Sequence, residues 1–350
     1  MTPKERVRTA FGRGRPDRLP ASVIFNSETE GGLFRIGAIS AEEKIKRYFR
    51  TDDYEVVLKR LGIDARWLRS RTPQKDPDRE TRWHGFVRGL KAAQTVEDLK
   101  RLETPDWRNY WDCSHLKEDL QKILDLDQSY AVFIEGPSIW EMVRCWRPMD
   151  VFMVEWLTDP EFAVTLFEMV YNFYMACYEA YVEELGDLVH EIDHIHGGSD
   201  FGMQDRPIVD PKLFERDYEP FLRREIAFFK RYFPEAVFEF HCCGSAVDFI
   251  PYLVRSGVDV LHPVQPGCAG MDFDQLKAAW GEKLAFRGGI DAQGVLARGT
   301  ETEVREWVRY AFQTLGRNGG YMLDAHGIMP EVPVKNVLAV YDTVQNECWY

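Results

Sequence analysis

A histidine and a cysteine two positions apart, His241 and Cys243, are the residues of this sequence best suited to chemistry. They follow a short apolar run typical of a strand, so both side chains are expected on one face, with Cys242 turned away. Imidazole and thiolate are zinc ligands, and a third protein ligand with one open position would make a catalytic site. Glu239 shares the face one step deeper, as a supporting group or a fourth ligand. The alternative is a buried histidine beside core cysteines, because free cysteine is among the most buried residue types.

His326 is the expected third ligand of this zinc site. It follows the last predicted strand, and Gly327 beside it allows a tight turn. The alternative is a histidine that only hydrogen-bonds loop backbone. His194 and His196 also alternate onto one face of a strand, which leaves a competing metal site open.

Further polar side chains stand at the ends of neighbouring predicted strands, where a barrel of parallel strands places its active site. Asp200, Gln204 and Gln265 are the expected substrate-binding residues, and Glu135 and Asp291 are the expected catalytic residues that manage protons. Each of these types alone commonly caps a loop or is solvated. Together they would line a polar pocket.

The elements that must position these residues follow one repeated pattern. A short apolar, β-branched run is followed by a turn and then a long amphipathic stretch, which predicts βα units. The predicted strands are Ala21–Phe25, Ile63–Leu68, Ala131–Glu135, Val189–Ile195, Ala236–Phe240, Val258–Leu261, Leu284–Arg287 and Gly320–Leu323. Asp159-Pro160 starts a helix that runs to about Leu185, Asp210-Pro211 starts another, and 302–315 reads as a third.

Eight such strands predict an α/β protein with one (β/α)8 TIM-barrel domain over residues 1–350. The charged, Trp-rich segment 76–127 is expected to be an insertion over the barrel mouth. A doubly wound open sheet is the competing architecture. It normally has a Gly-rich fingerprint after the first strand. The residues there are Asn26-Ser27-Glu28-Thr29-Glu30-Gly31-Gly32, so the fingerprint is missing.

Composition excludes several classes of protein. The net charge of −13 argues against a nucleic-acid partner, because phosphate backbones are bound through clustered Lys and Arg. No apolar run approaches the ~18 residues of a membrane helix, and the first residues lack the apolar run of a secretory signal, so a cytoplasmic protein is expected. Of the 7 cysteines only Cys242 and Cys243 are grouped, and in a long chain without a secretory signal grouped cysteines are expected to be metal ligands or reactive thiols rather than disulfides.

From about Gly197 to Tyr341 the chain resembles the uroporphyrinogen decarboxylase superfamily, and within it the branch of corrinoid-linked methyltransferases. The resemblance rests on five ordered motifs: Gly198-Ser199-Asp200-Phe201-Gly202-Met203-Gln204, His241-Cys242-Cys243-Gly244, His262-Pro263-Val264-Gln265-Pro266, Phe286-Arg287-Gly288-Gly289-Ile290-Asp291, and the run from His326-Gly327-Ile328-Met329-Pro330 to Asn336. The N-terminal half matches more loosely, through Thr2-Pro3-Lys4-Glu5-Arg6-Val7 and Glu135-Gly136-Pro137.

The resemblance implies a TIM barrel and, in the methyltransferase branch, a zinc held by a His-x-Cys pair and a later cysteine. His241 and Cys243 match the pair, but His326 stands where the later cysteine would be. One thiolate and two imidazoles leave the site at a charge of about +1, which favours a Lewis acid for an ether oxygen over an activator of thiols. The resemblance also implies a homodimer and a corrinoid cofactor. The chain lacks the Asp-x-His-x-x-Gly motif usual in corrinoid-binding modules, so a partner protein is expected to carry the corrinoid.

The expected function is therefore a zinc-dependent methyltransferase, acting between a small methylated substrate, such as a methyl ether, and a separate corrinoid protein. Porphyrinogen decarboxylation is disfavoured, because that activity needs an arginine-rich N-terminal segment and the first strand here leads into an acidic sequence, 26–30. Two alternatives stay open. One is a metal-assisted lyase or decarboxylase of a small acid, and the other is a non-catalytic binding protein.

Overall fold

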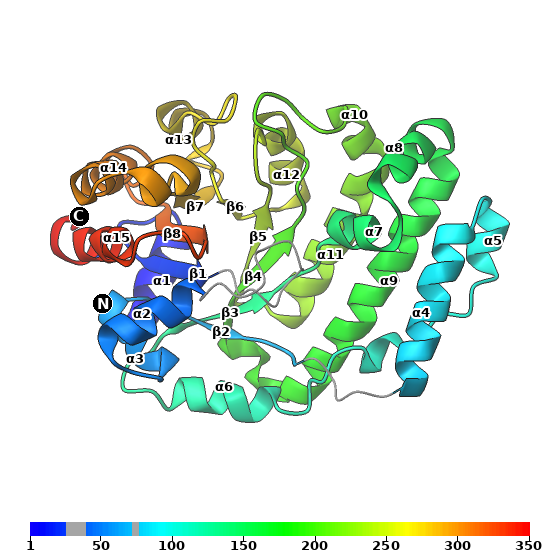
Figure 1. Ribbon diagram of the computed structural model, residues 1–350, viewed down its shortest axis with the longest axis horizontal. Helices are drawn as coiled ribbons and strands as arrows, with labels where there is room; N and C mark the ends of the chain where they lie inside the picture. The colour runs from blue at the N-terminus through cyan, green and yellow to red at the C-terminus, as the bar shows by residue number, and fades with distance from the viewer. Residues whose placement is uncertain (26–39, 72–76) are drawn as a thin grey trace.

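The computed structural model describes residues 1–25, 40–71 and 77–350, so the acidic segment after the first strand lies outside the described residues. Eight parallel strands form one sheet in the order β1-β8-β7-β6-β5-β4-β3-β2, with helices around it (Figure 1). They are β1 (Ala21–Phe25), β2 (Ala65–Leu68), β3 (Ala131–Glu135), β4 (Ile192–Gly198), β5 (Val237–His241), β6 (Val260–His262), β7 (Ala285–Gly289) and β8 (Tyr321–Ile328). The predicted (β/α)8 barrel is confirmed.

The helices complete the fold. Before β4 they are α1 (Pro3–Phe11), α2 (Ala41–Phe49), α3 (Tyr54–Leu61), α4 (Pro77–Ala92), α5 (Val96–Lys100), η1 (Trp107–Asn109), α6 (Leu116–Leu124), α7 (Ile139–Trp146), α8 (Met149–Thr158), α9 (Pro160–Leu185) and η2 (Gly186–Glu191). After β4 they are α10 (Pro211–Leu213), η3 (Phe214–Tyr218), α11 (Glu219–Tyr232), η4 (Val247–Phe249), α12 (Ile250–Ser256), α13 (Phe273–Trp280), η5 (Ala292–Leu296), α14 (Glu301–Thr314) and α15 (Val334–Glu347). No helix of the described residues is both long enough and apolar enough to cross a membrane.

The longest helix, α9, begins and ends where the sequence predicts. The Asp159 side chain accepts a hydrogen bond from the backbone N–H of Phe162 at 3.1 Å, and Pro160 takes the first helical position, where its missing N–H costs nothing. At the other end Gly186 has a positive φ of 55°, a backbone conformation that glycine adopts without strain.

Six of the eight strands differ from their predicted bounds by one or more residues, and β4 and β8 differ most. Val189 lies in the turn η2, so β4 starts at Ile192 and carries His194 and His196 within it. β8 runs on to Ile328, because β1 continues to pair with it after β7 has ended. His326 therefore lies in the last part of β8, where the sequence predicts the following loop.

The inside of the barrel is apolar at one end and polar at the other. Val7 and Phe11 of α1 pack into the N-terminal end of the barrel against small and aromatic residues of the strands, among them Phe133. Phe133 stacks on the ring of His194 with a centroid distance of 4.1 Å. From this layer towards the C-terminal strand ends the inward side chains are histidines, carboxylates and an arginine, which form the candidate site.

The barrel closes through a seam between β1 and β2. Among the described residues no ladder joins these two strands. Asp64, just before β2, donates its backbone N–H to the carbonyl of Ala21 at 2.9 Å and accepts the N–H of Ala21 on its carboxylate, also at 2.9 Å. The same buried carboxylate pairs with Arg6 at 2.6 Å and Arg18 at 3.0 Å. One residue, Asp64, thus makes the closing contact through both its backbone and its side chain.

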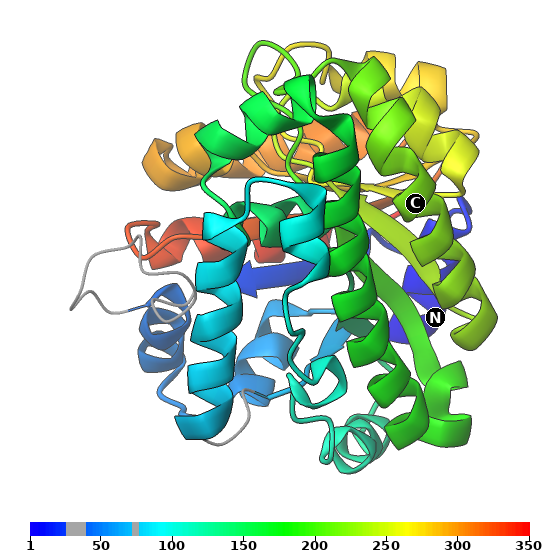
Figure 2. The same cartoon turned by 90° about the vertical axis from the view of Figure 1, so that its right-hand side faces the viewer.

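The described residues of the segment predicted as an insertion, 77–127, pack on the outside of the barrel. Its helices contact α7, α9 and β2 (Figure 2, cyan). Trp83, Phe86 and Trp107 form an aromatic cluster with Trp146 of α7 and Phe173 of α9, with ring centroids 5.1–6.3 Å apart. None of its described residues lines the cavity at the barrel mouth.

Candidate metal centre

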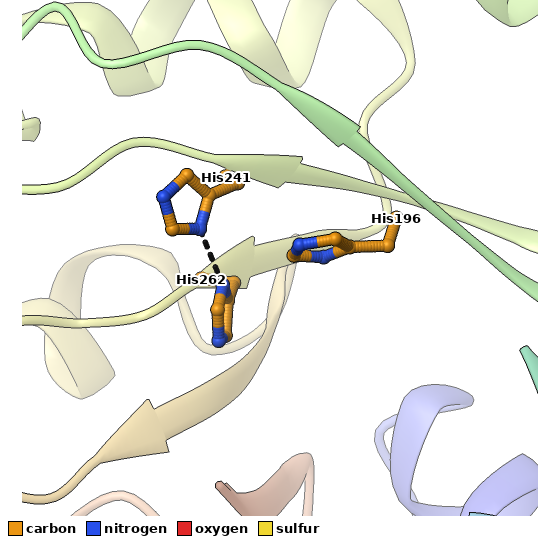
Figure 3. Close-up of side chains that lie close together, drawn as sticks. All are labelled: His196, His241 and His262. Carbon is orange, nitrogen blue, oxygen red and sulfur yellow. Dashed lines mark hydrogen bonds between the residues drawn. The ribbon is translucent and has the colours of Figure 1, made fainter. Parts of the chain in front are cut away.

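Four imidazoles meet near the C-terminal ends of the strands: His196 of β4, His241 of β5, His262 of β6 and His326 of β8. The ring of His241 lies 4.9 Å from both His262 and His326, and those two are 4.8 Å apart, measured between centroids. His196 lies 5.1 Å from His262 and 5.5 Å from His241. Figure 3 shows His196, His241 and His262 pointing towards one another from neighbouring strands.

The structure brings together the three predicted zinc ligands. One ligand atom each from His241, Cys243 and His326 lie within 4.8 Å of one another, and Cys243 Sγ is 3.4 Å from His241 Nε2. Nδ1 of His326 is buried and has no hydrogen-bond partner among the described residues, which suits an atom meant for a metal. The donor set therefore fits a zinc ion. Two other triplets meet the same distance criterion, His196/His241/His262 and His262/Asp324/His326.

Below the ligands lies a buried ionic layer. Glu239 Oε1 accepts from Arg287 Nη1 at 2.7 Å and contacts His196 Nδ1, and Glu239 Oε2 contacts His194 Nε2 at 3.1 Å. Burial alone would raise the pKa of Glu239, but Arg287 and the surrounding histidines lower it well below its usual value. Glu239 is thus an ionised carboxylate one layer beneath the ligands.

A second set of contacts links the ligands to this layer. His241 Nδ1 and His262 Nδ1 are 2.7 Å apart, and His262 Nε2 lies 3.1 Å from Asp324 Oδ2. Asp324 Oδ1 accepts the hydroxyl hydrogen of Ser22 at 2.6 Å, and Arg287 Nη2 is 3.4 Å from Asp324 Oδ2.

The surroundings shift the pKa values of the two histidines predicted as zinc ligands in opposite directions. Burial would lower the pKa of His241, but Cys243 and Asp200, whose Oδ1 is 3.3 Å from His241 Nε2, raise it well above the usual range. Burial and the charge of His241 lower the pKa of His326 to about 3. Without a metal, these contacts favour a second proton on the His241 ring. A metal would displace it, because ligands bind in the deprotonated form.

A cavity of about 620 Å³ opens beside Cys243 and His326, a size usual for small-molecule sites. Cys243, Asp324 and His326 border it. Its other lining residues are Pro263, Gln265, Pro266, Gly289, Ile290, Asp291, Ala292, Gln293, Ala297, Arg298, Gly327, Met329, Glu331 and Val332. The wall thus combines apolar side chains with a few polar groups.

The predicted substrate-binding residues lie at different distances from this cavity. Asp200 is beside the ligands, where its Oδ1 accepts the backbone N–H of Cys243 at 2.7 Å. Gln265 lines the cavity, and its Oε1 accepts the N–H of Gly244 at 2.9 Å. Gln204 is exposed and is not among the lining residues.

The predicted catalytic carboxylates both have structural partners. Asp291 borders the cavity, but its two oxygens cap η5 by accepting the N–H groups of Gly294 at 2.8 Å and Val295 at 3.1 Å. Glu135, at the end of β3, pairs with Arg69 at 3.2 Å and is not among the lining residues.

Comparison with known proteins agrees with this architecture. A family model described as uroporphyrinogen decarboxylase (URO-D) matches residues 90–347. The chain belongs to this family. A solved structure of a methyltransferase from Methanosarcina mazei has the same fold, with a TM-score of 0.67 over 99% of this chain and 98% of that chain. The two sequences are 14% identical, so the likeness establishes the fold. No curated protein sequence matches the chain significantly.

In this member of the uroporphyrinogen decarboxylase family, four buried residues have no role that is predicted from the sequence: Ser22, His262, Arg287 and Asp324. All four are buried and joined by hydrogen bonds or ion pairs. The signal that was available is the placement of His262, Arg287 and Asp324 at the ends of three successive predicted strands, with opposite charges on the last two. Which of these charged side chains are buried against one another depends on how the barrel closes, and the spacing of residues in the sequence does not reveal these pairs.

Proposed function

We propose that this protein is a zinc-dependent methyltransferase that moves a methyl group between a small methylated substrate, most simply a methyl ether, and a corrinoid carried by a separate protein. The observation that carries the proposal is the convergence of His241, Cys243 and His326, two of which, Cys243 and His326, line a cavity of about 620 Å³. Membership of the uroporphyrinogen decarboxylase family, and the fold shared with a methyltransferase from Methanosarcina mazei, support it.

The ligand set favours an ether oxygen over a thiol sulfur as the substrate atom that the metal would activate. One thiolate and two imidazoles leave a divalent zinc with a charge of about +1, and a zinc ion held there would supply Lewis-acid chemistry towards an oxygen atom. The chain itself binds and orients the substrate. Ile290, Met329 and Val332 give the cavity an apolar wall for the body of a small molecule, and Gln265 is held in place by Gly244.

Asp200 is proposed to hold the ligand loop, because its carboxylate fixes the backbone of Cys243 and lies beside His241. Asp291 is proposed to shape the cavity wall by capping η5. Glu135 lies outside the lining, so it carries no step in this proposal.

Metal analysis and a methyl-transfer assay test the proposal together. The purified protein should contain about one zinc per chain, the number that one such ligand set holds. His241→Ala, Cys243→Ala and His326→Ala should each weaken zinc binding by more than about 100-fold, because loss of a mere supporting group already costs 10–100-fold. Cys242→Ala is the matched control. Its buried thiol belongs to none of the candidate ligand triplets; it accepts the N–H of Phe201 at 3.3 Å and donates to the backbone carbonyl of Cys243 at 3.6 Å.

The activity assay offers methyl ethers of small molecules with and without a reduced corrinoid protein. We expect methylated corrinoid and a demethylated product. Methyl transfer that never needs the corrinoid would contradict the proposal. Carbon dioxide release from a small acid would favour the lyase alternative, and a wild-type protein without zinc or turnover would favour a binding protein.

A further inference from the structure

We infer that His262 is a positioning residue of the metal site, which holds His241 in the tautomer whose Nε2 lone pair faces Cys243. The inference rests on the proposed function in one respect, the metal on His241, Cys243 and His326. It adds a role for a residue outside that ligand set, and for the buried groups that hold it.

The direction of the hydrogen bonds that link His241, His262 and Asp324 follows from the last acceptor, Asp324. Asp324 accepts the Ser22 hydroxyl on one oxygen and faces the Arg287 guanidinium with the other, as a carboxylate acceptor does, so His262 Nε2 donates across the 3.1 Å contact. A neutral imidazole has one N–H, so Nδ1 of His262 is then an acceptor. His241 Nδ1 must therefore donate across the 2.7 Å contact that Figure 3 shows as a dashed line. That leaves Nε2 of His241, 3.4 Å from Cys243 Sγ, as its ligand atom.

Asp324 is itself fixed from the other side. Its Oδ1 accepts from Ser22 Oγ at 2.6 Å, and Ser22 Oγ in turn accepts from Arg287 Nε at 3.0 Å. His262, Asp324, Ser22 and Arg287 are all at most 1% exposed. Bulk water therefore does not offer these groups alternative partners, and the order of donors and acceptors persists. Metal-binding histidines generally use their second nitrogen in this way.

The same contacts decide between His262 as a support and His262 as a ligand. His262 belongs to two of the triplets that could hold a metal. Both of its ring nitrogens are already engaged, Nδ1 by His241 and Nε2 by Asp324. His326, in contrast, has a buried Nδ1 without a partner among the described residues. The structure thus assigns the ligand role to His326 and the supporting role to His262.

Two variants of equal shape test the inference. His262→Leu removes the acceptor, whereas His262→Asn places an amide oxygen near the position of Nδ1. Zinc affinity is measured by competition with a chelator, and the ligand set by the visible spectrum of the Co²⁺-substituted protein. We expect His262→Leu to bind zinc 10–100-fold more weakly, His262→Asn to recover most of that loss, and both to keep the Co²⁺ ligand set of the wild type.

Three results would overturn the inference: a His262→Leu protein that binds zinc like the wild type, a His262→Asn protein as weak as His262→Leu, or a Co²⁺ spectrum that shows one nitrogen donor fewer in both. The wild-type protein gives a further test that needs no variant to fold. In the zinc-loaded protein with ¹⁵N-labelled histidine, His241 should carry its proton on Nδ1 and His262 on Nε2, and the reverse order would refute the argument. Wild-type protein that binds no zinc would contradict the proposed function itself, whereas the other failures concern His262 alone.

Discussion

Replacing Arg287 by methionine should strongly destabilise the barrel. The guanidinium of Arg287 is fully buried and contacts Glu239 at 2.7 Å, Ser22 at 3.0 Å and Asp324 at 3.4 Å. Methionine fills much of the same space but leaves two buried carboxylates without the cation that they share. Removing one partner of a buried ion pair costs about 3–5 kcal/mol, so the free energy of unfolding should fall by that amount.

A matched surface substitution provides the scale. Arg309→Met removes an arginine that pairs with Glu347 at 2.6 Å with both side chains at least 36% exposed, and such pairs contribute about 0–1 kcal/mol. Arg287→Lys keeps the charge but loses the planar set of five donors, so it should fall between the two. Unfolding by urea is followed by tryptophan fluorescence and circular dichroism on metal-free protein.

A loss in Arg287→Met no larger than that in Arg309→Met would refute the reasoning, because it would mean that the carboxylates of the buried layer do not need a cation. If Arg287→Met does not fold, the comparison of Arg287→Lys with Arg309→Met decides the question in the same way. A Lys variant as stable as the wild type would then contradict the role given to the planar guanidinium.

Two further predictions concern the rest of the fold. Burial raises the pKa of the Glu225 carboxyl to about 8 from an ordinary 4.5. Its contribution to the free energy of unfolding is therefore full below about pH 4.5 and declines as the pH rises towards 8, by up to about 1.4 kcal/mol per pH unit. Glu225→Gln should flatten this slope between urea midpoints at pH 6 and 8, and an unchanged slope would count against the assignment. Gly288 has a φ of 114°, and a Cβ there would lie 1.8 Å from the Pro263 carbonyl oxygen, so Gly288→Ala should cost more than the 1–3 kcal/mol typical of a strained backbone alone. Gly85→Ala, in α4 with nothing within 4 Å, should instead stabilise by up to about 1 kcal/mol, and equal thermal midpoints for the two variants would disprove the contrast.

The parts of the fold that were predictable are those encoded locally. Asp159 and Pro160 mark the start of α9 because a cap and a missing N–H act within one turn of helix. The failures occur where distant partners decide. Val189 is apolar like a strand residue, yet it lies in η2, and β8 extends to Ile328 only because β1 pairs with it there.

The residues of the candidate site likewise divide into those predicted from local spacing and those whose contacts depend on distant parts of the chain. His241 and Cys243 were identified by their spacing, although β5 ends at His241 and Cys243 lies in the loop that follows. His326 lies 85 positions after His241 in the chain, and the two rings are in contact in the structure. The sequence suggests this contact only through the barrel pattern. Asp291 shows the limit of residue type as evidence, since a carboxylate at a strand end is equally suited to capping a helix.

The seam between β1 and β2 is the place where the barrel is expected to open first. Seven of its neighbouring strand pairs are held by ladders, in which the loss of one hydrogen bond leaves the others in place. At the seam, Ala21, Arg6 and Arg18 all depend on the carboxylate of Asp64, so that contact is kept or lost as a unit. Local opening draws on the parts of a structure with the fewest independent contacts. The barrel should therefore open between β1 and β2, while His241 and His262, on strands β5 and β6 in the middle of the sheet order, stay in register.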